Sequence, residues 1–145
     1  MINGNALNSY QKAQLYDEID SRKLVLLLYE VAIKKIMNAK KGIENNDPKQ
    51  RGENIGKAIA IITELNASLD EDIQTEEINF LRSLYFSMLK ELTKISLTND
   101  LTTLDRIQRY LTELKNIWVK SVMNNNDMKK DDLGKNNYQG ASFSI

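Results

Sequence analysis

The chain has 145 residues, the usual size of one domain, and its 20 basic and 20 acidic side chains give a formal net charge of zero. It contains no histidine and no cysteine. These absences exclude disulfides, nearly every zinc, copper, haem or iron–sulfur site built from protein ligands, and histidine-assisted nucleophiles. The zero balance also argues against a general nucleic-acid binder, which usually needs a basic surface.

The first ten residues lack the basic stretch and apolar core of a secretory signal. The longest apolar run, residues 24–29, is far shorter than the roughly 20 residues that a membrane span needs. We therefore expect a soluble, cytoplasmic protein that does not insert into a membrane.

Residues 1–19 mix a few apolar side chains, among them Leu7 and Tyr10, with polar ones. This pattern predicts a short amphipathic helix that lies on the rest of the fold as an N-terminal cap segment.

The first long helix is expected from about residue 21 to residue 43, with Asp20 and Ser21 as N-cap candidates. Its apolar residues surround most of the cylinder, which is too many for a helix with one solvated side. The expected core stripe is Leu24, Leu27, Leu28, Val31 and Ile36, and the apolar surface is extended by Leu26, Tyr29, Ile33 and Met37. This helix should be the most buried one, or it should offer a second apolar face to a partner.

Three further helices follow clear breaks. The second should begin at Pro48, with Asp47 as its cap, and run to about Leu69. Thr75 with the two glutamates after it predicts the start of the third, and the break at 99–100 precedes the fourth, which should end near residue 124. The expected core stripes are Ile55, Ala58, Ile59, Ile62, Leu65 and Leu69, then Ile78, Leu81, Leu84, Tyr85, Met88, Leu92 and Ile95, then Leu104, Ile107, Leu111, Leu114, Trp118 and Val122.

Four helices joined by short links favour an up-down-up-down arrangement. The predicted fold class is all-α: an antiparallel four-helix bundle over residues 20–123, with the cap segment over residues 1–19. Residues 124–145 are rich in Asn, Asp, Lys, Gly and Ser, which predicts a disordered polar tail.

The charged residues form no catalytic pattern. The acids at 71–72 and 76–77 are interpreted as helix caps and solvated groups, because nothing apolar surrounds them locally. The lysine pairs at 34–35, 40–41 and 129–130 have acids nearby and indicate solvated faces. The scattered glycines form no phosphate loop. We expect no enzyme activity, no metal site and no cofactor.

Several short motifs, in a fixed order along the four helices, together carry a family resemblance. They are Tyr10-Gln11, Leu28-Tyr29-Glu30 with Ala32, Lys57-Ala58, Ile61-Ile62, Leu65, Leu69-Asp70, Leu84-Tyr85, Asn99-Asp100 and Trp118. With these residues the chain, over roughly residues 7–122, resembles the FliS family of flagellin-specific export chaperones. It departs from the family pattern at residues 72–75, where a Gly-Gly pair is common.

The resemblance implies a binding protein without catalysis. Such a chaperone would bind the disordered C-terminal region of newly made flagellin, prevent premature polymerisation and deliver it to the flagellar type III export gate. By resemblance, Leu7 and Tyr10 belong to a cap that moves when flagellin binds. The other expected flagellin-binding residues are Leu28, Tyr29, Ile59, Ile62, Tyr85 and Met88, for each of which ordinary core packing is an equally open interpretation.

One alternative stays open. The same apolar surface would suit a non-chaperone helical adaptor, or a self-associating bundle that forms a weak homodimer. The expected partners are therefore the flagellin C-terminal segment and the export gate, with a second copy of the chain as the alternative.

Overall fold

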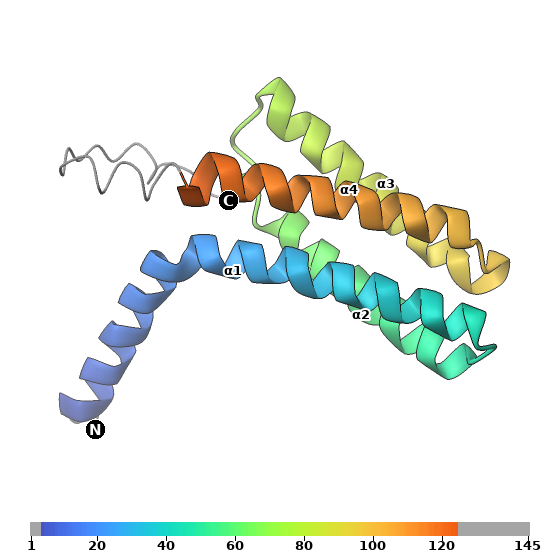
Figure 1. Ribbon diagram of the computed structural model, residues 1–145. Helices are drawn as coiled ribbons and strands as arrows, with labels where there is room; N and C mark the ends of the chain where they lie inside the picture. The colour runs from blue at the N-terminus through green and yellow to red at the C-terminus, as the bar shows by residue number, and fades with distance from the viewer. Residues whose placement is uncertain (1–3, 125–145) are drawn as a thin grey trace.

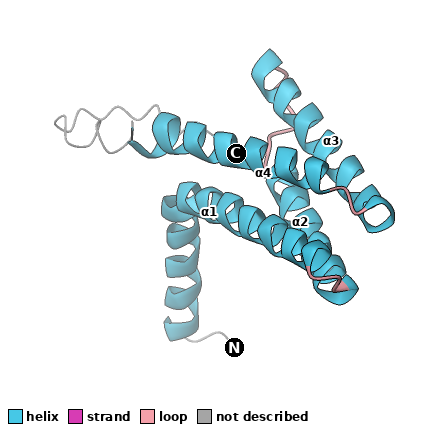
Figure 2. Cartoon of the chain, turned by 45° about the vertical axis from the view of Figure 1, so that its right-hand side comes forward, coloured by secondary structure: helices cyan, strands magenta, loops and turns pink. Residues whose placement is uncertain are grey.

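The computed structural model describes residues 4–124, and the side chains of residues 21–122. Its helices are α1 (Gly4–Glu44), α2 (Pro48–Ala67), α3 (Glu76–Thr98), α4 (Leu101–Trp118) and a short π-helix, η1 (Val119–Asn124). α1 packs against α2 and α4, and α2 packs against α3. Successive helices run in opposite directions, and the first turns of α3 diverge from the other helices (Figures 1 and 2). The prediction of an all-α fold with four packed helices is confirmed.

α1 begins at Gly4, so the prediction that the first bundle helix starts near residue 21 is wrong. No proline lies in this helix and no glycine separates Gly4 from Gly42, so nothing stops the helix at the cap candidates Asp20 and Ser21. Figures 1 and 2 show the N-terminal part of α1 leading away from the bundle. The cap role of residues 1–19 stays a prediction. The predicted disordered tail, apart from its first residue, lies outside the described residues.

α2 and α3 begin at the predicted positions after Asp47 and at Thr75, and α4 begins directly after the predicted break at residues 99–100. The Asp47 carboxylate accepts a hydrogen bond from the Gln50 backbone N–H at 3.1 Å, and the Thr75 hydroxyl accepts one from the Ile78 N–H at 3.2 Å. Asp100 caps α4, and hydrogen bonds from the side chain and backbone of Thr103 hold the pKa of Asp100 below its ordinary value. α2 ends at Ala67 rather than at Leu69.

The core differs from the predicted stripes mainly in α1. The stripes expected in α2, α3 and α4 are buried or half-buried, as predicted. In α1, by contrast, Leu24 and Leu27 are 55% and 52% exposed. The buried residues are Val25, Tyr29, Ala32, Ile36 and Ala39. The predicted α1 stripe is therefore confirmed at Ile36 and wrong at Leu24 and Leu27, and α1 presents a second apolar face.

Small residues explain this choice of face. Ala32 and Ala39 are fully buried, and alanine contributes little to a hydrophobic pattern read from sequence. At the end of the same face, a Cβ added to Gly42 would lie 2.5 Å from the backbone nitrogen of Arg51 in α2. Helices approach closely where side chains are small, so this face of α1 is the one that packs.

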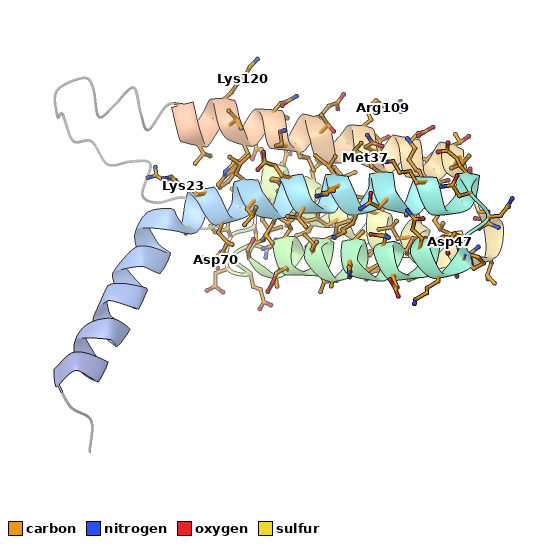
Figure 3. All side chains as sticks on the ribbon, turned by 60° about the horizontal axis from the view of Figure 1, so that its bottom comes forward. Lys23, Met37, Asp47, Asp70, Arg109 and Lys120 are labelled. Carbon is orange, nitrogen blue, oxygen red and sulfur yellow. The ribbon has the colours of Figure 1, made fainter. Side chains whose placement is uncertain are left out.

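The two connections at the ends of α2 lie at opposite ends of the bundle. Figure 3 shows Asp47 in the turn before α2 and Asp70 in the loop after it. The loop after α2 lacks the family's Gly-Gly pair and is held by Arg82. This guanidinium donates to the carbonyl of Ile73 at 3.1 Å and to the carbonyl of Asp70.

Candidate functional site

Four of the residues predicted to bind flagellin lie in the core. Tyr29, Ile62, Tyr85 and Met88 are between 0% and 4% exposed. In this arrangement of the helices they offer no surface to a partner. Their predicted contact with flagellin stays a prediction, and it would require the helices to separate.

Two of these residues form a buried polar pair that joins α1 to α3. The hydroxyl oxygens of Tyr29 and Tyr85 lie 2.5 Å apart, so one hydroxyl donates and the other accepts. Burial removes both phenols from water and raises the pKa of Tyr29 and of Tyr85, which keeps both protonated at neutral pH. The pair therefore joins α1 to α3 by a buried hydrogen bond.

One group of exposed apolar side chains lies on α1. Leu24, Leu27, Leu28 and Val31, which we call the α1 leucine patch, lie within about 100° of the helix circumference. Leu24 and Leu27 are more than half exposed, while Leu28 and Val31 are half-buried. Of the residues predicted to bind flagellin, Leu28 belongs to this patch, and Ile59 is likewise half-buried, on α2. The sequence signal for the patch was the spacing of the buried α1 residues from Val25 to Ala39, which are alternately four and three residues apart. A core face with that spacing leaves the four patch residues on the neighbouring face of the helix.

The C-terminal end of the bundle is attached beside this patch. The indole N–H of Trp118 donates to the backbone carbonyl of Arg22 at 3.0 Å. Val122, in η1, is buried, and η1 packs on α1. These contacts fix the end of α4 next to the start of the leucine patch.

The remaining two predicted residues precede the patch along the same helix. The backbone of Leu7 and Tyr10 belongs to α1, and their side chains lie outside the part that the structure describes. α1 thus connects the predicted cap residues directly to the leucine patch, without a loop between them.

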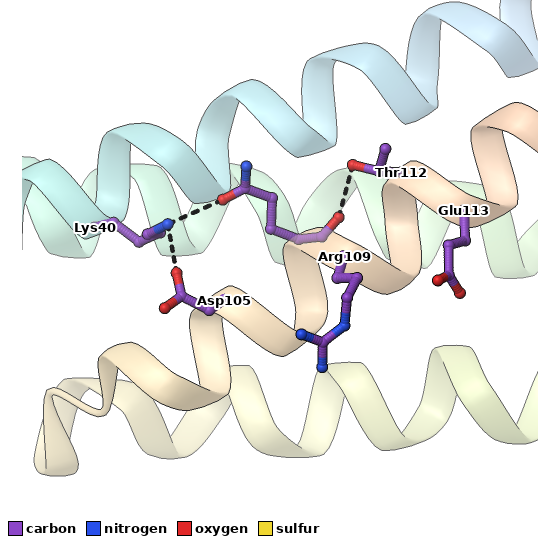
Figure 4. Close-up of a pocket in the computed structure, with 6 residues that line it drawn as sticks. Lys40, Asp105, Arg109, Thr112 and Glu113 are labelled. Atoms are coloured by element: carbon purple, nitrogen blue, oxygen red, sulfur yellow. Dashed lines mark hydrogen bonds and ion pairs between the residues drawn. The ribbon is translucent and has the colours of Figure 1, made fainter.

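A polar notch of about 280 Å³ lies between α1 and α4 (Figure 4). Its lining residues are Lys40, Asp105, Gln108, Arg109, Thr112 and Glu113. The Lys40 ammonium pairs with the Asp105 carboxylate and donates to Gln108 Oε1 at 3.2 Å. Thr112 donates to the carbonyl of Gln108 at 2.9 Å. The contacts of Lys40 with Asp105 and Gln108 join α1 to α4 at this notch.

Residues 4–124 contain neither grouped metal ligands nor a membrane-spanning helix. Within the described residues, no three His, Cys, Asp or Glu side chains are grouped so that they could hold a metal ion. None of the described helices is long and apolar enough to span a membrane.

Similarity to a known protein family extends along the described region. The family model for the flagellar protein FliS matches residues 3–126. The chain is similar to the flagellar secretion chaperone FliS of Campylobacter jejuni, with 32% identity over 117 residues, 81% of this chain and 88% of that protein. For the flagellar secretion chaperone FliS of Bacillus subtilis the identity is 31% over 100 residues, 69% of this chain and 74% of that protein. For the flagellar secretion chaperone FliS of Salmonella typhimurium the identity is 25% over 122 residues, which are 81% of this chain and 90% of that protein.

Proposed function

The chain belongs to the FliS family of flagellar secretion chaperones, which are not enzymes, and from this premise we propose that it binds the C-terminal region of flagellin. In this proposal the protein acts in the cytoplasm, keeps flagellin from polymerising early and delivers it to the flagellar export gate. The observation that supports it best is the α1 leucine patch, an apolar surface in which Leu24 and Leu27 are more than half exposed.

The patch fits the chemistry of such a client. A flagellin terminus before assembly is an unpaired amphipathic segment, and its apolar stripe needs a surface that excludes water. Amphipathic helices bind by placing apolar anchors at three- and four-residue spacing against an apolar face. The patch residues at positions 24, 27, 28 and 31 follow that three- and four-residue spacing along α1.

Leu7 and Tyr10 have a different role in the proposal. Because α1 is continuous, a change in the direction of its N-terminal part changes what lies beside Leu24 and Leu27. We assign Leu7 and Tyr10 to a cap that gives way when flagellin binds. Leu28 and Ile59 contact the flagellin segment. The helices that carry Leu28 and Ile59 are held in place by four buried residues, Tyr29, Ile62, Tyr85 and Met88.

The test is titration calorimetry of the full chain with the last roughly 40 to 60 residues of flagellin from the same organism. Fully burying a leucine contributes about 1.5–3 kcal/mol, and Leu24 and Leu27 are about half exposed. The double variant Leu24→Ser with Leu27→Ser should therefore weaken binding about 10- to 100-fold. The heat-capacity change of wild-type binding should be negative, because apolar surface is buried.

Leu97→Ser is the matched control, because Leu97 is an exposed leucine on another helix, α3. It should leave the affinity for the flagellin segment unchanged. Equal affinities for wild type and the Leu24/Leu27 variant would remove the leucine patch from the site. A chain that ignores flagellin but forms a homodimer, lost in the Leu24/Leu27 variant, would favour the self-associating adaptor instead.

A further inference from the structure

A second apolar surface lies on α3 and has no place in the function proposed above. Phe86, Leu89, Thr93 and Leu97, which we call the α3 stripe, repeat at spacings of three, four and four residues. They lie within about 80° of the helix circumference. Phe86 and Leu97 are 68% and 88% exposed, and Leu89 is half-buried. Two large apolar side chains in line along one face differ from the scattered single exposures that are normal on a protein surface.

Most of the stripe points away from the bundle, and Leu89 at its edge packs against the core. The buried residues of α3 are Tyr85, Met88, Leu92 and Ile95, which centre roughly 120° or more around the helix from the stripe. The stripe therefore lies on a different face from the α3 residues that were predicted to bind flagellin. It also lies on a different helix from the α1 leucine patch.

The charges beside the stripe have one sign. Lys90 and Lys94 are exposed and follow the stripe along one edge. Between residues 79 and 98 the sequence contains one acid, Glu91, and its carboxylate faces the Arg106 guanidinium of α4 at 4.0 Å. Among the described residues, no ion pair is formed by Lys90 or Lys94. The stripe is thus an apolar strip with a basic edge.

We propose that the α3 stripe docks an acidic amphipathic helix of a partner protein, separate from the flagellin site. Phe86 and Leu97 are about 16 Å apart along the axis, which corresponds to three turns of a bound helix. The partner carries apolar anchors every three or four residues, and carboxylates along the edge that meets Lys90 and Lys94.

The charge pattern selects this occupant over two others. A second copy that used the same stripe would place its own Lys90 and Lys94 near these lysines, and like charges oppose such a contact. An anionic membrane surface is usually bound through clusters of about four to eight basic residues, and this edge has two.

The experiment measures binding of two synthetic helical peptides of about 18 residues to the full chain by fluorescence anisotropy at low salt. Both peptides carry leucines at positions i, i+3, i+7 and i+11, and they differ in flanking glutamates or flanking lysines. Wild type should bind the glutamate peptide and discriminate against the lysine peptide. The charge-reversed variant Lys90→Glu with Lys94→Glu should lose about tenfold in affinity for the glutamate peptide and gain affinity for the lysine peptide.

Two further variants test whether peptide binding depends on the α3 stripe itself or only on the overall charge of the protein. Lys49→Glu with Lys57→Glu makes the same charge change on exposed positions of α2 and should leave both affinities unchanged. Phe86→Ser with Leu97→Ser should abolish peptide binding and keep full affinity for the flagellin segment. Failure of the flagellin proposal would leave these peptide results unaffected.

Three results would each overturn the inference. The first is wild-type binding of the lysine peptide as tight as that of the glutamate peptide. The second is loss of flagellin binding in the Phe86/Leu97 variant, which would make the stripe part of the flagellin site. The third is a dimer in sedimentation that the Phe86/Leu97 variant abolishes, which would make a second copy the occupant.

Discussion

The buried tyrosine pair allows a sharp test of whether Tyr29 and Tyr85 serve the core or a partner. Each hydroxyl is the hydrogen-bond partner of the other, and the residues are 4% and 1% exposed. Tyr29→Phe or Tyr85→Phe removes one partner and leaves the other hydroxyl buried without a hydrogen bond. An unsatisfied buried hydroxyl costs about 1–3 kcal/mol, so each single variant should lose about that much free energy of unfolding.

The double variant should behave differently. Tyr29→Phe with Tyr85→Phe removes both hydroxyls and leaves no orphaned polar group, while the rings keep their packing. Replacing both partners by apolar groups of the same shape is nearly neutral. We therefore expect the double variant to be more stable than either single variant, with a strongly non-additive double-mutant cycle.

Urea unfolding of the four proteins measures this cycle. Tyr110→Phe is the matched control, because Tyr110 is half-buried on α4, and its change should stay within about 0.5 kcal/mol. Additive losses in the cycle would refute the reasoning, since they would mean that the two hydroxyls do not depend on each other. If the hydroxyls serve the core alone, the double variant should also bind the flagellin segment as wild type does.

Three further predictions concern the packing and the caps. Gly42→Ala should destabilise the chain by about 1–3 kcal/mol in urea, because its Cβ would meet the Arg51 backbone at 2.5 Å, whereas Gly56→Ala, with nothing within 4 Å, should stabilise it. A stable Gly42→Ala protein would show that α1 and α2 are farther apart. Trp118→Phe should cost about 1–2 kcal/mol and lower the hydrogen-exchange protection of η1, because the bond to the Arg22 carbonyl is lost; unchanged protection would contradict this. The pKa of Asp100 is lowered in the fold, so its stabilisation is present above the ordinary aspartate pKa and is lost as pH falls through the lowered pKa. The Asp100→Asn variant should therefore have a lower free energy of unfolding than wild type at pH 7, and this difference should shrink in acid. A difference that stays constant with pH would contradict the stabilising role of the Asp100 carboxylate.

Much of the helical structure follows from local signals in the sequence. Asp47, Thr75 and Asp100 cap their helices through hydrogen bonds to backbone groups within three residues, so short-range chemistry determines where α2, α3 and α4 begin. The same kind of short-range signal led to the wrong prediction that a helix starts at Asp20 or Ser21. A good cap residue within a run of helix formers does not end a helix, because the interior hydrogen bonds are already made.

The candidate site depended on information that the sequence does not hold locally. Successive residues of a helix point about 100° apart, so a core stripe through Leu24 and one through Val25 differ by a rotation of α1 of about 100°. Both stripes are apolar, and the hydrophobic pattern fits either. The rotation is decided by where α2 and α4 pack, which is where Ala32, Ala39 and Gly42 permit close approach.

The sequence alone determined a helical protein with well-defined helix starts after Asp47, at Thr75 and after the break at 99–100, no histidine or cysteine chemistry, and an apolar surplus that implied binding. Tertiary structure decided which part of that surplus is core and which is surface. It buried Tyr29 against Tyr85 and left Leu24, Leu27, Phe86 and Leu97 in solvent. The physical reason is that caps and helix propensity act within a few residues, whereas burial is settled by helices that are distant along the chain.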